Sequence, residues 1–257
     1  MYNLSEVNHK YGENVHILSN PLSSTLLTKF SSKDVIQPEL NQLLHKMYFI
    51  LLEAVTSHSF PRAHSEVVTR MEEKLESEVL TFDQRVVLVD LARAGIYPAH
   101  MCFEILNYIL KPEGLRQDHF YVNRKVDEND QVIGVDVSGS KIGGDVDEAI
   151  VLLPDPMGAT GGSLSFAIDH YKKSVEGQAK KYIAMHLIIT PEYIKRMSQD
   201  HPEVEIYALR LDRGMSSEKA LKAIPGEFPE EERGLSGIQY IIPGAGGVGE
   251  ILNNSFV

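Results

Sequence analysis

The stretch Val151–Ser163 reads VLLPDPMGATGGS and decides the fold. The apolar run Ala149–Leu153 predicts a buried β-strand that ends just before Asp155. Small residues follow from Gly158 to Ser163, and apolar spacing over residues 164–171 then predicts a helix. Such a strand–loop–helix unit suits a phosphate, because small residues leave backbone N–H groups open at the positive end of a helix. We therefore expect a phosphorylated sugar or nucleotide as ligand.

The loop differs from the two best-known phosphate loops. A P-loop has a lysine after its second glycine, and none follows Gly162. The order Gly-Ala-Thr-Gly-Gly also lacks the Gly-x-Gly-x-x-Gly spacing of dinucleotide sites. What marks the loop is Asp155 at the strand end, with hydroxyl donors at Thr160 and Ser163. A carboxylate there suits ribose hydroxyls or a Mg²⁺ held by phosphates. The competing interpretation is an ordinary glycine-rich turn.

Composition restricts the classes of partner. The 257 residues include 36 acids against 25 Lys plus Arg, a formal net charge of −11, which argues against nucleic acid or an anionic membrane. No apolar run is long enough to span a membrane, and the first residues do not resemble a signal peptide. The single cysteine, Cys102, excludes an internal disulfide and fits a reducing cytoplasm. Its apolar neighbours predict a buried structural thiol.

Strand and helix patterns alternate along the chain. This order predicts an α/β fold: a mainly parallel twisted sheet with helices on both faces, a small hood or hairpin region and an N-terminal helical extension. Residues 214–237 are expected to form a solvated surface excursion, with a lid or subunit contact as the alternative. The expected helices are 38–57, 63–78, 99–109 and 191–200; the expected strands are 85–89, 120–122, 183–189 and 205–211; and 131–141 is expected to be a hairpin.

Four segments resemble one known family. Asp155–Ser163 resembles the 5-phosphoribosyl diphosphate (PRPP) loop of the uracil phosphoribosyltransferases, Asp-Pro-Met-Leu-Ala-Thr-Gly-Gly-Ser/Thr, with Gly158 in place of the leucine. Asn20–Leu22 resembles the family's His-Pro-Leu, and Leu91–Gly95 its Leu-Arg-Ala-Gly turn. Gln239–Gly246 resembles Tyr-Ile-Val-Pro-Gly-Leu-Gly. The resemblance covers most of the chain and implies a type I phosphoribosyltransferase fold.

The resemblance implies one phosphoribosyltransferase-like domain over residues 1–257. An N-terminal arm with helices would occupy 1–80, the core with the PRPP loop 81–213, and a long loop with the base-binding hood 214–257. The implied enzyme moves the 5-phosphoribosyl group of PRPP to uracil in the cytoplasm, giving UMP and pyrophosphate for pyrimidine salvage. Mg²⁺ would be bound mainly through the diphosphate, with no metal site of the protein's own. The implied partners are small-molecule substrates and a second copy or further copies, as homodimer or homotetramer, with no nucleic acid and no membrane.

The implied site has three parts. Arg93 follows a strand and precedes small residues, so it can meet a diphosphate with backbone and guanidinium, and it is paired with Asp155 as catalytic. A loop cation would close the site, Arg124 or alternatively Lys125. The residues implied to bind PRPP are Arg93, Arg124, Asp155, Pro156, Met157, Gly158, Ala159, Thr160, Gly161, Gly162 and Ser163; those implied to bind the base through the backbone are Ile241, Gly246, Gly247 and Val248.

One departure from the family bears on activity. The family usually has Gly-Asp-Ala-Gly-Asp where this chain has Gly-Gly-Val-Gly-Glu at residues 246–250. In the family the first aspartate contacts PRPP or its metal, which Gly247 cannot do, and Glu250 could partly compensate. Two alternatives therefore stay open: a non-catalytic regulator that binds PRPP or a nucleotide, and a phosphoribosyltransferase for a different base.

Overall fold

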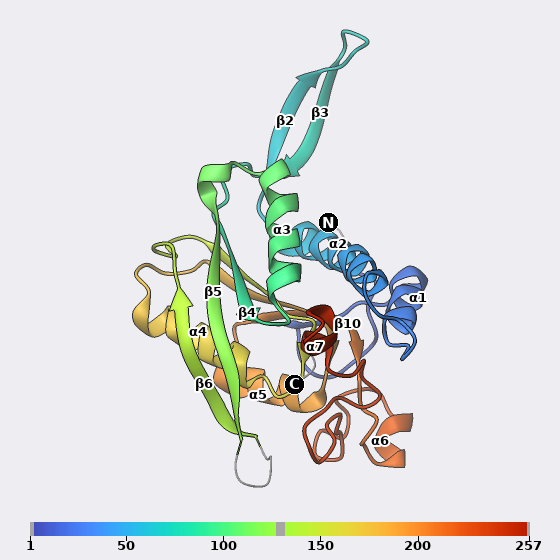
Figure 1. Ribbon diagram of the computed structural model, residues 1–257. Helices are drawn as coiled ribbons and strands as arrows, with labels where there is room; N and C mark the ends of the chain where they lie inside the picture. The colour runs from blue at the N-terminus through green and yellow to red at the C-terminus, as the bar shows by residue number, and fades with distance from the viewer. Residues whose placement is uncertain (1–2, 127–131, 256–257) are drawn as a thin grey trace.

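The computed structural model describes residues 3–126 and 132–255, except for the side chains of 123–126 and 132–137. Its centre is an eight-stranded sheet in which β5–β6 is the antiparallel pair and the other pairs are parallel, so the predicted α/β class is confirmed (Figure 1). In spatial order the strands are β1 (Val15–Ile17), β10 (Glu205–Leu211), β9 (Lys181–Ile189), β7 (Ile150–Pro154), β4 (Val86–Ala92), β5 (Leu115–Val126) and β6 (Val132–Lys141), with β8 (Met157–Gly158) also pairing with β9.

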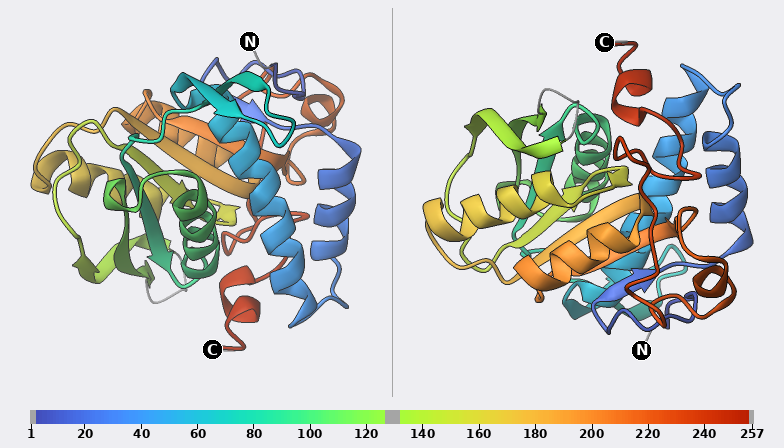
Figure 2. Two further views of the ribbon diagram at one scale, coloured as in Figure 1. Left: turned by 90° about the horizontal axis from the view of Figure 1, so that it is seen from above. Right: turned by 90° about the horizontal axis from the view of Figure 1, so that it is seen from below.

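Helices cover both faces of this sheet, as the sequence predicts (Figure 2). Within β9, Ile183 and Met185 pack into the core on one side, and Tyr182 and Ala184 into the core on the other. Strands buried on both faces explain the nearly continuous apolar runs. One face carries α1 (Pro21–Phe30), α2 (Glu39–Ser59) and α3 (Ile96–Ile109); the other carries α4 (Gly162–Ser174) and α5 (Pro191–Asp200). Short pieces complete the chain: η1 (Pro112–Gly114), α6 (Glu218–Lys222) and α7 (Val248–Leu252).

The helix predicted over residues 63–78 is wrong. This segment is an antiparallel hairpin of β2 (Arg62–Val68) and β3 (Lys74–Leu80) that projects from the body (Figure 1). Most of its side chains are exposed on both faces of the ribbon. The density of charged residues therefore indicated exposure correctly, but it carried no information about the type of element. The β-branched pair Val67 and Val68 was the overlooked signal for a strand.

The first part of the expected N-terminal arm over residues 1–80 does more than extend from the body, because it contributes a strand to the central sheet. Its strand β1 joins the edge of the central sheet beside β10. The next helix, α1, starts at a cap: the Asn20 side chain accepts a 2.8 Å hydrogen bond from Ser23 N–H, and Pro21 takes the first helical position. The predicted buried thiol is confirmed: Cys102 lies in α3 without solvent contact, and burial raises its pKa.

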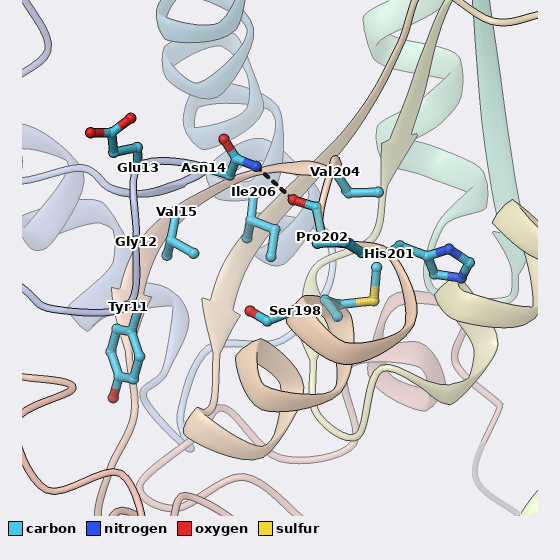
Figure 3. A pocket seen from close by; sticks show the side chains of 11 residues that line it. Tyr11, Gly12, Glu13, Asn14, Val15, Ser198, His201, Pro202, Val204 and Ile206 are labelled. Carbon is cyan, nitrogen blue, oxygen red and sulfur yellow. Dashed lines mark hydrogen bonds between the residues drawn. The ribbon is translucent and has the colours of Figure 1, made fainter.

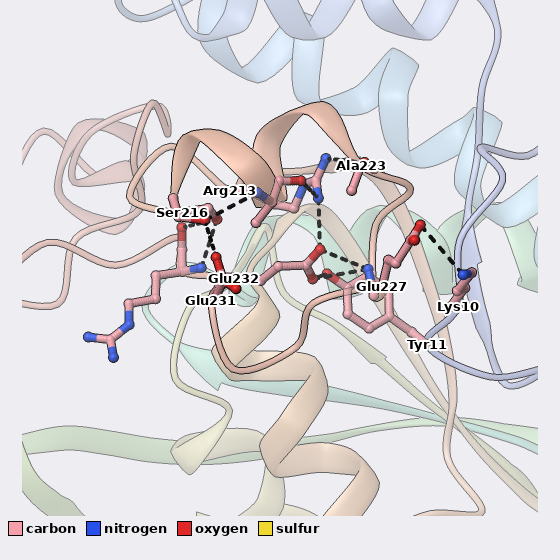
Figure 4. A network of polar contacts seen from close by, with 12 residues as sticks. Lys10, Tyr11, Arg213, Ser216, Ala223, Glu227, Glu231 and Glu232 are labelled. Carbon is pink, nitrogen blue, oxygen red and sulfur yellow. Dashed lines mark hydrogen bonds and ion pairs between the residues drawn. The ribbon is translucent and has the colours of Figure 1, made fainter.

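The excursion over residues 214–237 lies on the surface with most of its residues at least partly exposed, as expected, and a buried acid anchors it (Figure 4). The carboxylate of Glu232 is completely buried and pairs with Arg213 at 2.8 Å. It also accepts hydrogen bonds from Tyr11 O–H and from Gly226 N–H, the latter at 2.9 Å. One buried acid therefore fastens the excursion to the N-terminal segment.

Candidate functional site

The segments predicted to form the site meet at one edge of the sheet. Strands β4 and β7 are parallel neighbours, so the turns that follow them, at Arg93 and Asp155, leave the sheet on the same side. The turn after β4 approaches the end of β7 closely: a Cβ on Gly95 would lie 3.2 Å from the carbonyl oxygen of Pro154. The structure thus brings Arg93 next to the predicted PRPP loop.

Backbone contacts with β9 fix the first half of that loop. Asp155 N–H donates a 3.0 Å hydrogen bond to the Met185 carbonyl, and the Asp155 carboxylate accepts one of 2.9 Å from Met157 N–H. The carboxylate therefore folds the chain back over Pro156. Met157–Gly158 then pairs with β9 as β8, and Thr190 Oγ1 donates a 2.6 Å bond to the Ala159 carbonyl. These contacts tie the first half of the loop to β9 and to Thr190.

The second half of the loop is the start of α4. Gly161 has φ +76°, a left-handed conformation that glycine adopts without steric cost. The first hydrogen bond of the helix runs from Ser165 N–H to the Gly161 carbonyl. The N–H groups of residues 162–164 therefore have no acceptor within the helix. Thr160 Oγ1 lies 3.4 Å from Gly162 N–H. Residues 155–163 thus form one turn that ends at a positive helix terminus.

A buried histidine of β9 hydrogen-bonds the first residue of the loop. His186 Nδ1–H donates a 2.6 Å hydrogen bond to the Asp155 carbonyl, and Nε2 accepts one of 2.7 Å from Tyr193 O–H. Because desolvation by burial lowers the pKa of His186 to about 4, the imidazole is neutral at pH 7. Sequence reasoning did not assign His186 to the loop, although a histidine inside an apolar strand was a visible signal.

Gly158, where the family usually has leucine, is closely surrounded by other side chains. A Cβ at this position would lie 2.8 Å from Ile189 Cγ2 and 3.2 Å from Tyr193 Cδ2. Side chains of β9 and α5 therefore occupy the space that a leucine at 158 would need.

The guanidinium of Arg93 faces the C-terminal segment. Its Nη1 donates a 2.5 Å hydrogen bond to Ser255 Oγ, and its Nη2 lies 3.9 Å from Glu250 Oε1. The side chain is 41% exposed, so it can be reached from solvent. The peptide bond that precedes it, Ala92–Arg93, is cis.

The predicted base segment lies over this turn and is tied to the end of β10. Asp212 Oδ2 accepts a 2.8 Å bond from Gly244 N–H and one of 2.9 Å from Arg210 Nη2, which also donates to the Gly244 carbonyl at 3.1 Å. Ile241 and Val248 bury their side chains, so these two residues would offer backbone groups to a ligand. Arg210 and Asp212 were missed, although their spacing puts them on one face of a strand end.

The side chain of the predicted loop cation lies outside the described part of the chain. Arg124 and Lys125 belong to β5, where their backbones pair with Val135 and Gly134 of β6. Their side chains lie outside the described part of the chain.

A cavity of about 370 Å³ lies elsewhere (Figure 3). It is bounded by residues 11–15, the C-terminal end of α5 and the first part of β10, and Asn14 Nδ2 donates a 2.6 Å bond to the Pro202 carbonyl beside it. None of the predicted site residues lines it. This cavity is at the amino ends of β1 and β10, whereas the loop lies at the carboxyl ends of β4 and β7.

The acids near the loop include Asp155 and Glu250, side chains of the kind that contact Mg²⁺ held by phosphates. Among residues 3–126 and 132–255, no group of three or more His, Cys, Asp or Glu side chains is placed to hold a metal ion. Mg²⁺ typically binds through one or two carboxylates plus substrate phosphates, which the acids of this edge can supply. In the same described ranges, no helix is long and apolar enough to cross a membrane.

Sheet order, loop and hood together define the phosphoribosyltransferase class of α/β enzymes. A solved structure, that of the AQ2163 protein from Aquifex aeolicus, has the same fold, with a TM-score of 0.70, 23% identity and coverage of 93% of this chain and 97% of that one.

The uracil phosphoribosyltransferase family model matches residues 17–228, so the chain belongs to this family. The matched range includes Arg93 and the loop and ends before the predicted base segment. Two curated proteins named uracil phosphoribosyltransferase are similar over nearly their whole length. The one from Caldanaerobacter subterraneus subsp. tengcongensis is 26% identical over 248 residues, covering 93% of this chain and 97% of that protein. The one from Shouchella clausii is 27% identical over 247 residues, with the same shares.

Proposed function

We propose that the protein transfers the 5-phosphoribosyl group of PRPP to uracil, giving UMP and pyrophosphate. The observation that carries this proposal is the loop of residues 155–163, held by β9 and adjacent to Arg93 at the carboxyl edge of the sheet. Membership of the family supports the class of reaction, and the names of the relatives support the base.

Positioning and charge carry most of this reaction. The leaving diphosphate departs from an oxocarbenium-like carbon, so the protein must hold the groups in line and stabilise negative charge. In our proposal the N–H groups of residues 160–163 hold the 5′-phosphate and Asp155 orients the ribose hydroxyls. The Ala159 N–H donates to the Met157 carbonyl at 3.0 Å and shapes the loop instead. Arg93 takes up the charge that develops on the diphosphate. Mg²⁺, when bound with PRPP, would add further neutralisation of that diphosphate.

The base would be recognised through the backbone. Ile241 and residues 246–248 lie on the hood that Asp212 fastens to β10. Their N–H and C=O groups can match the donors and acceptors of a uracil edge. Because the family match ends at residue 228, the choice of base is the part of the proposal that needs measurement first.

The direct test is turnover. The protein is incubated with Mg²⁺, PRPP and labelled uracil, and UMP is measured, with adenine, hypoxanthine, guanine and cytosine tested in parallel. UMP formation above the other nucleotides supports the proposal. Product from another base assigns a different specificity, and PRPP binding without product from any base supports the non-catalytic regulator.

We also propose a cytoplasmic homodimer or homotetramer. The β2–β3 hairpin supports self-association, because Val67, Val68 and Met71 are exposed on it, at 52%, 68% and 82%. Light scattering coupled to size exclusion measures the molar mass directly. A monomer at micromolar concentration would contradict this part of the proposal.

A further inference from the structure

The carboxylate of Glu250 occupies the space in which a side chain at Gly247 would lie. A Cβ on Gly247 would lie 2.2 Å from Glu250 Oε2 and 3.1 Å from Glu250 Cδ. The φ of Gly247 is −77°, a value that any L residue adopts. The backbone therefore does not require glycine at 247. A side chain at 247 would displace the carboxylate of Glu250.

Packing of α7 sets the position of this carboxylate. Glu250 N–H donates a 3.1 Å hydrogen bond to the Gly247 carbonyl, which closes the first turn of α7. Val248 and Leu252 are buried at 2% and 9% exposure and hold the helix against the core. On the other side, a Cβ on Gly249 would lie 3.5 Å from Ala94 Cβ. The helix thus carries Glu250 onto the turn that contains Arg93.

Glu250 faces the cation of the proposed diphosphate site. Its Oε1 lies 3.9 Å from Arg93 Nη2, and the two side chains are 34% and 41% exposed. A partly exposed pair at this distance contributes little to stability, so either group can be redirected to a ligand at small cost. The carboxylate is therefore both anchored through its helix and available to a substrate.

We propose that Glu250 supplies the carboxylate for the metal–diphosphate part of the site, in the space that the missing side chain at 247 would have occupied. The proposal rests on the proposed function, and the ligand class is a ribose diphosphate carried with a divalent cation. Such a cation keeps several waters and accepts one or two protein carboxylates, so a single acid is sufficient. Glutamate is needed rather than aspartate, because the extra methylene lets a residue at 250 reach across to Gly247.

The experiment compares binding of PRPP by wild type and variants at several Mg²⁺ concentrations, by calorimetry, together with KM for PRPP. Glu250→Gln keeps the shape and removes the charge, and Glu250→Asp keeps the charge and shortens the reach. We expect both to weaken Mg²⁺-dependent PRPP binding by at least roughly tenfold, because loss of a group that only orients a metal ligand already costs that much. Glu230→Gln, at a side chain that is 82% exposed, is the matched control and should bind as wild type does.

A relocation variant separates this role from a structural one. In Gly247→Asp with Glu250→Ala, the acid returns to the family position and no longer meets a competing side chain. We expect its PRPP affinity within about threefold of wild type, whereas Gly247→Asp alone displaces Glu250 and crowds two acids together. Melting temperatures without ligand show that each variant is folded.

The outcomes distinguish the two proposals. Wild-type binding of PRPP with no loss in Glu250→Gln overturns the role of Glu250 and leaves the proposed function intact. Equal weakening by Glu250→Gln with and without Mg²⁺, or no recovery in the relocation variant, also overturns it. A wild-type protein that fails to bind PRPP at all overturns the proposed function instead.

Discussion

The main-chain carbonyl of Asp155 accepts a 2.6 Å hydrogen bond from Nδ1–H of His186, so a side chain without solvent contact holds the residue that begins the PRPP loop. A carbonyl oxygen can only accept, which fixes the proton on Nδ1 and leaves Nε2 to accept from Tyr193. Burial, rather than these partners, keeps the imidazole neutral, because desolvation disfavours its charged form and lowers its pKa.

Stability should therefore fall when the pH drops below the unfolded-state pKa of histidine. Burial lowers the pKa of His186 from 6.5 to about 4, so between these values the unfolded chain binds more protons than the folded one. We expect His186 to lower the free energy of unfolding by about 3 kcal/mol between pH 6.5 and pH 4. Urea titrations of wild type and His186→Gln at several pH values measure this difference. Parallel pH profiles for the two proteins would show that His186 does not titrate in this way.

Gly158 should tolerate no side chain. Its Cβ would lie 2.8 Å from Ile189 Cγ2, so Gly158→Ala should lower the free energy of unfolding by about 1–3 kcal/mol through overpacking. Gly237→Ala is the control, because nothing lies within 4 Å of the Cβ that it would add. Chemical denaturation of both variants tests the contrast, and equal stability of the two would contradict the packing described around the loop.

Arg93→Ala should remove the cation beside the proposed diphosphate while leaving the fold intact, since its guanidinium is half exposed. We expect kcat/KM for PRPP to fall on the order of 10²–10³-fold, as for loss of other charge-stabilising groups. Lys173→Ala, which removes a cation that is 70% exposed near the end of α4, serves as the control and should keep wild-type kinetics. Steady-state assays with varied PRPP give the comparison, and an active Arg93→Ala enzyme would remove this residue from the site.

Asp155→Asn separates charge from loop geometry. The amide oxygen of asparagine can still accept the 2.9 Å bond from Met157 N–H, so the melting temperature should stay close to that of wild type. Without the charge, the bonds to ribose hydroxyls weaken, and we expect kcat/KM to fall roughly 10–100-fold. Kinetics and thermal melts on the same preparation distinguish this from unfolding. Full activity in Asp155→Asn would mean that the carboxylate has no role beyond the turn.

The buried acid of the 214–237 excursion should be important for stability. Glu232→Ala leaves Arg213, which is only 12% exposed, without its carboxylate, and we expect a loss of about 3–5 kcal/mol. Tyr11→Phe removes one donor to the same carboxylate and should cost about 1 kcal/mol. Glu230→Ala, at an exposed site, should change little. Denaturant titrations rank the three, and a ranking in which Glu232→Ala matches Glu230→Ala would contradict the anchoring role.

Much of the fold and loop could be predicted from the sequence because the signals are local. A buried parallel strand is an apolar run wherever it lies, and Ile183–Ile189 and Glu205–Leu211 were located to within a few residues. The loop was recognisable because an acid, hydroxyls and glycines follow such a run. The same logic failed for residues 63–78, because an exposed hairpin and an exposed helix show similar densities of charge.

The sequence alone determined the α/β class, the family and the turn at Asp155, since each follows from local patterns and from their order along the chain. Only the tertiary structure decided which side chains support that turn and which acid lies beside Arg93. Glu232 hydrogen-bonds Tyr11, which lies 221 positions earlier in the sequence. Glu250, near the C-terminus, lies beside Arg93. Such partners are set by how helices and loops pack onto the sheet. Periodicity describes the face that one element presents, whereas a contact also depends on the element packed against it.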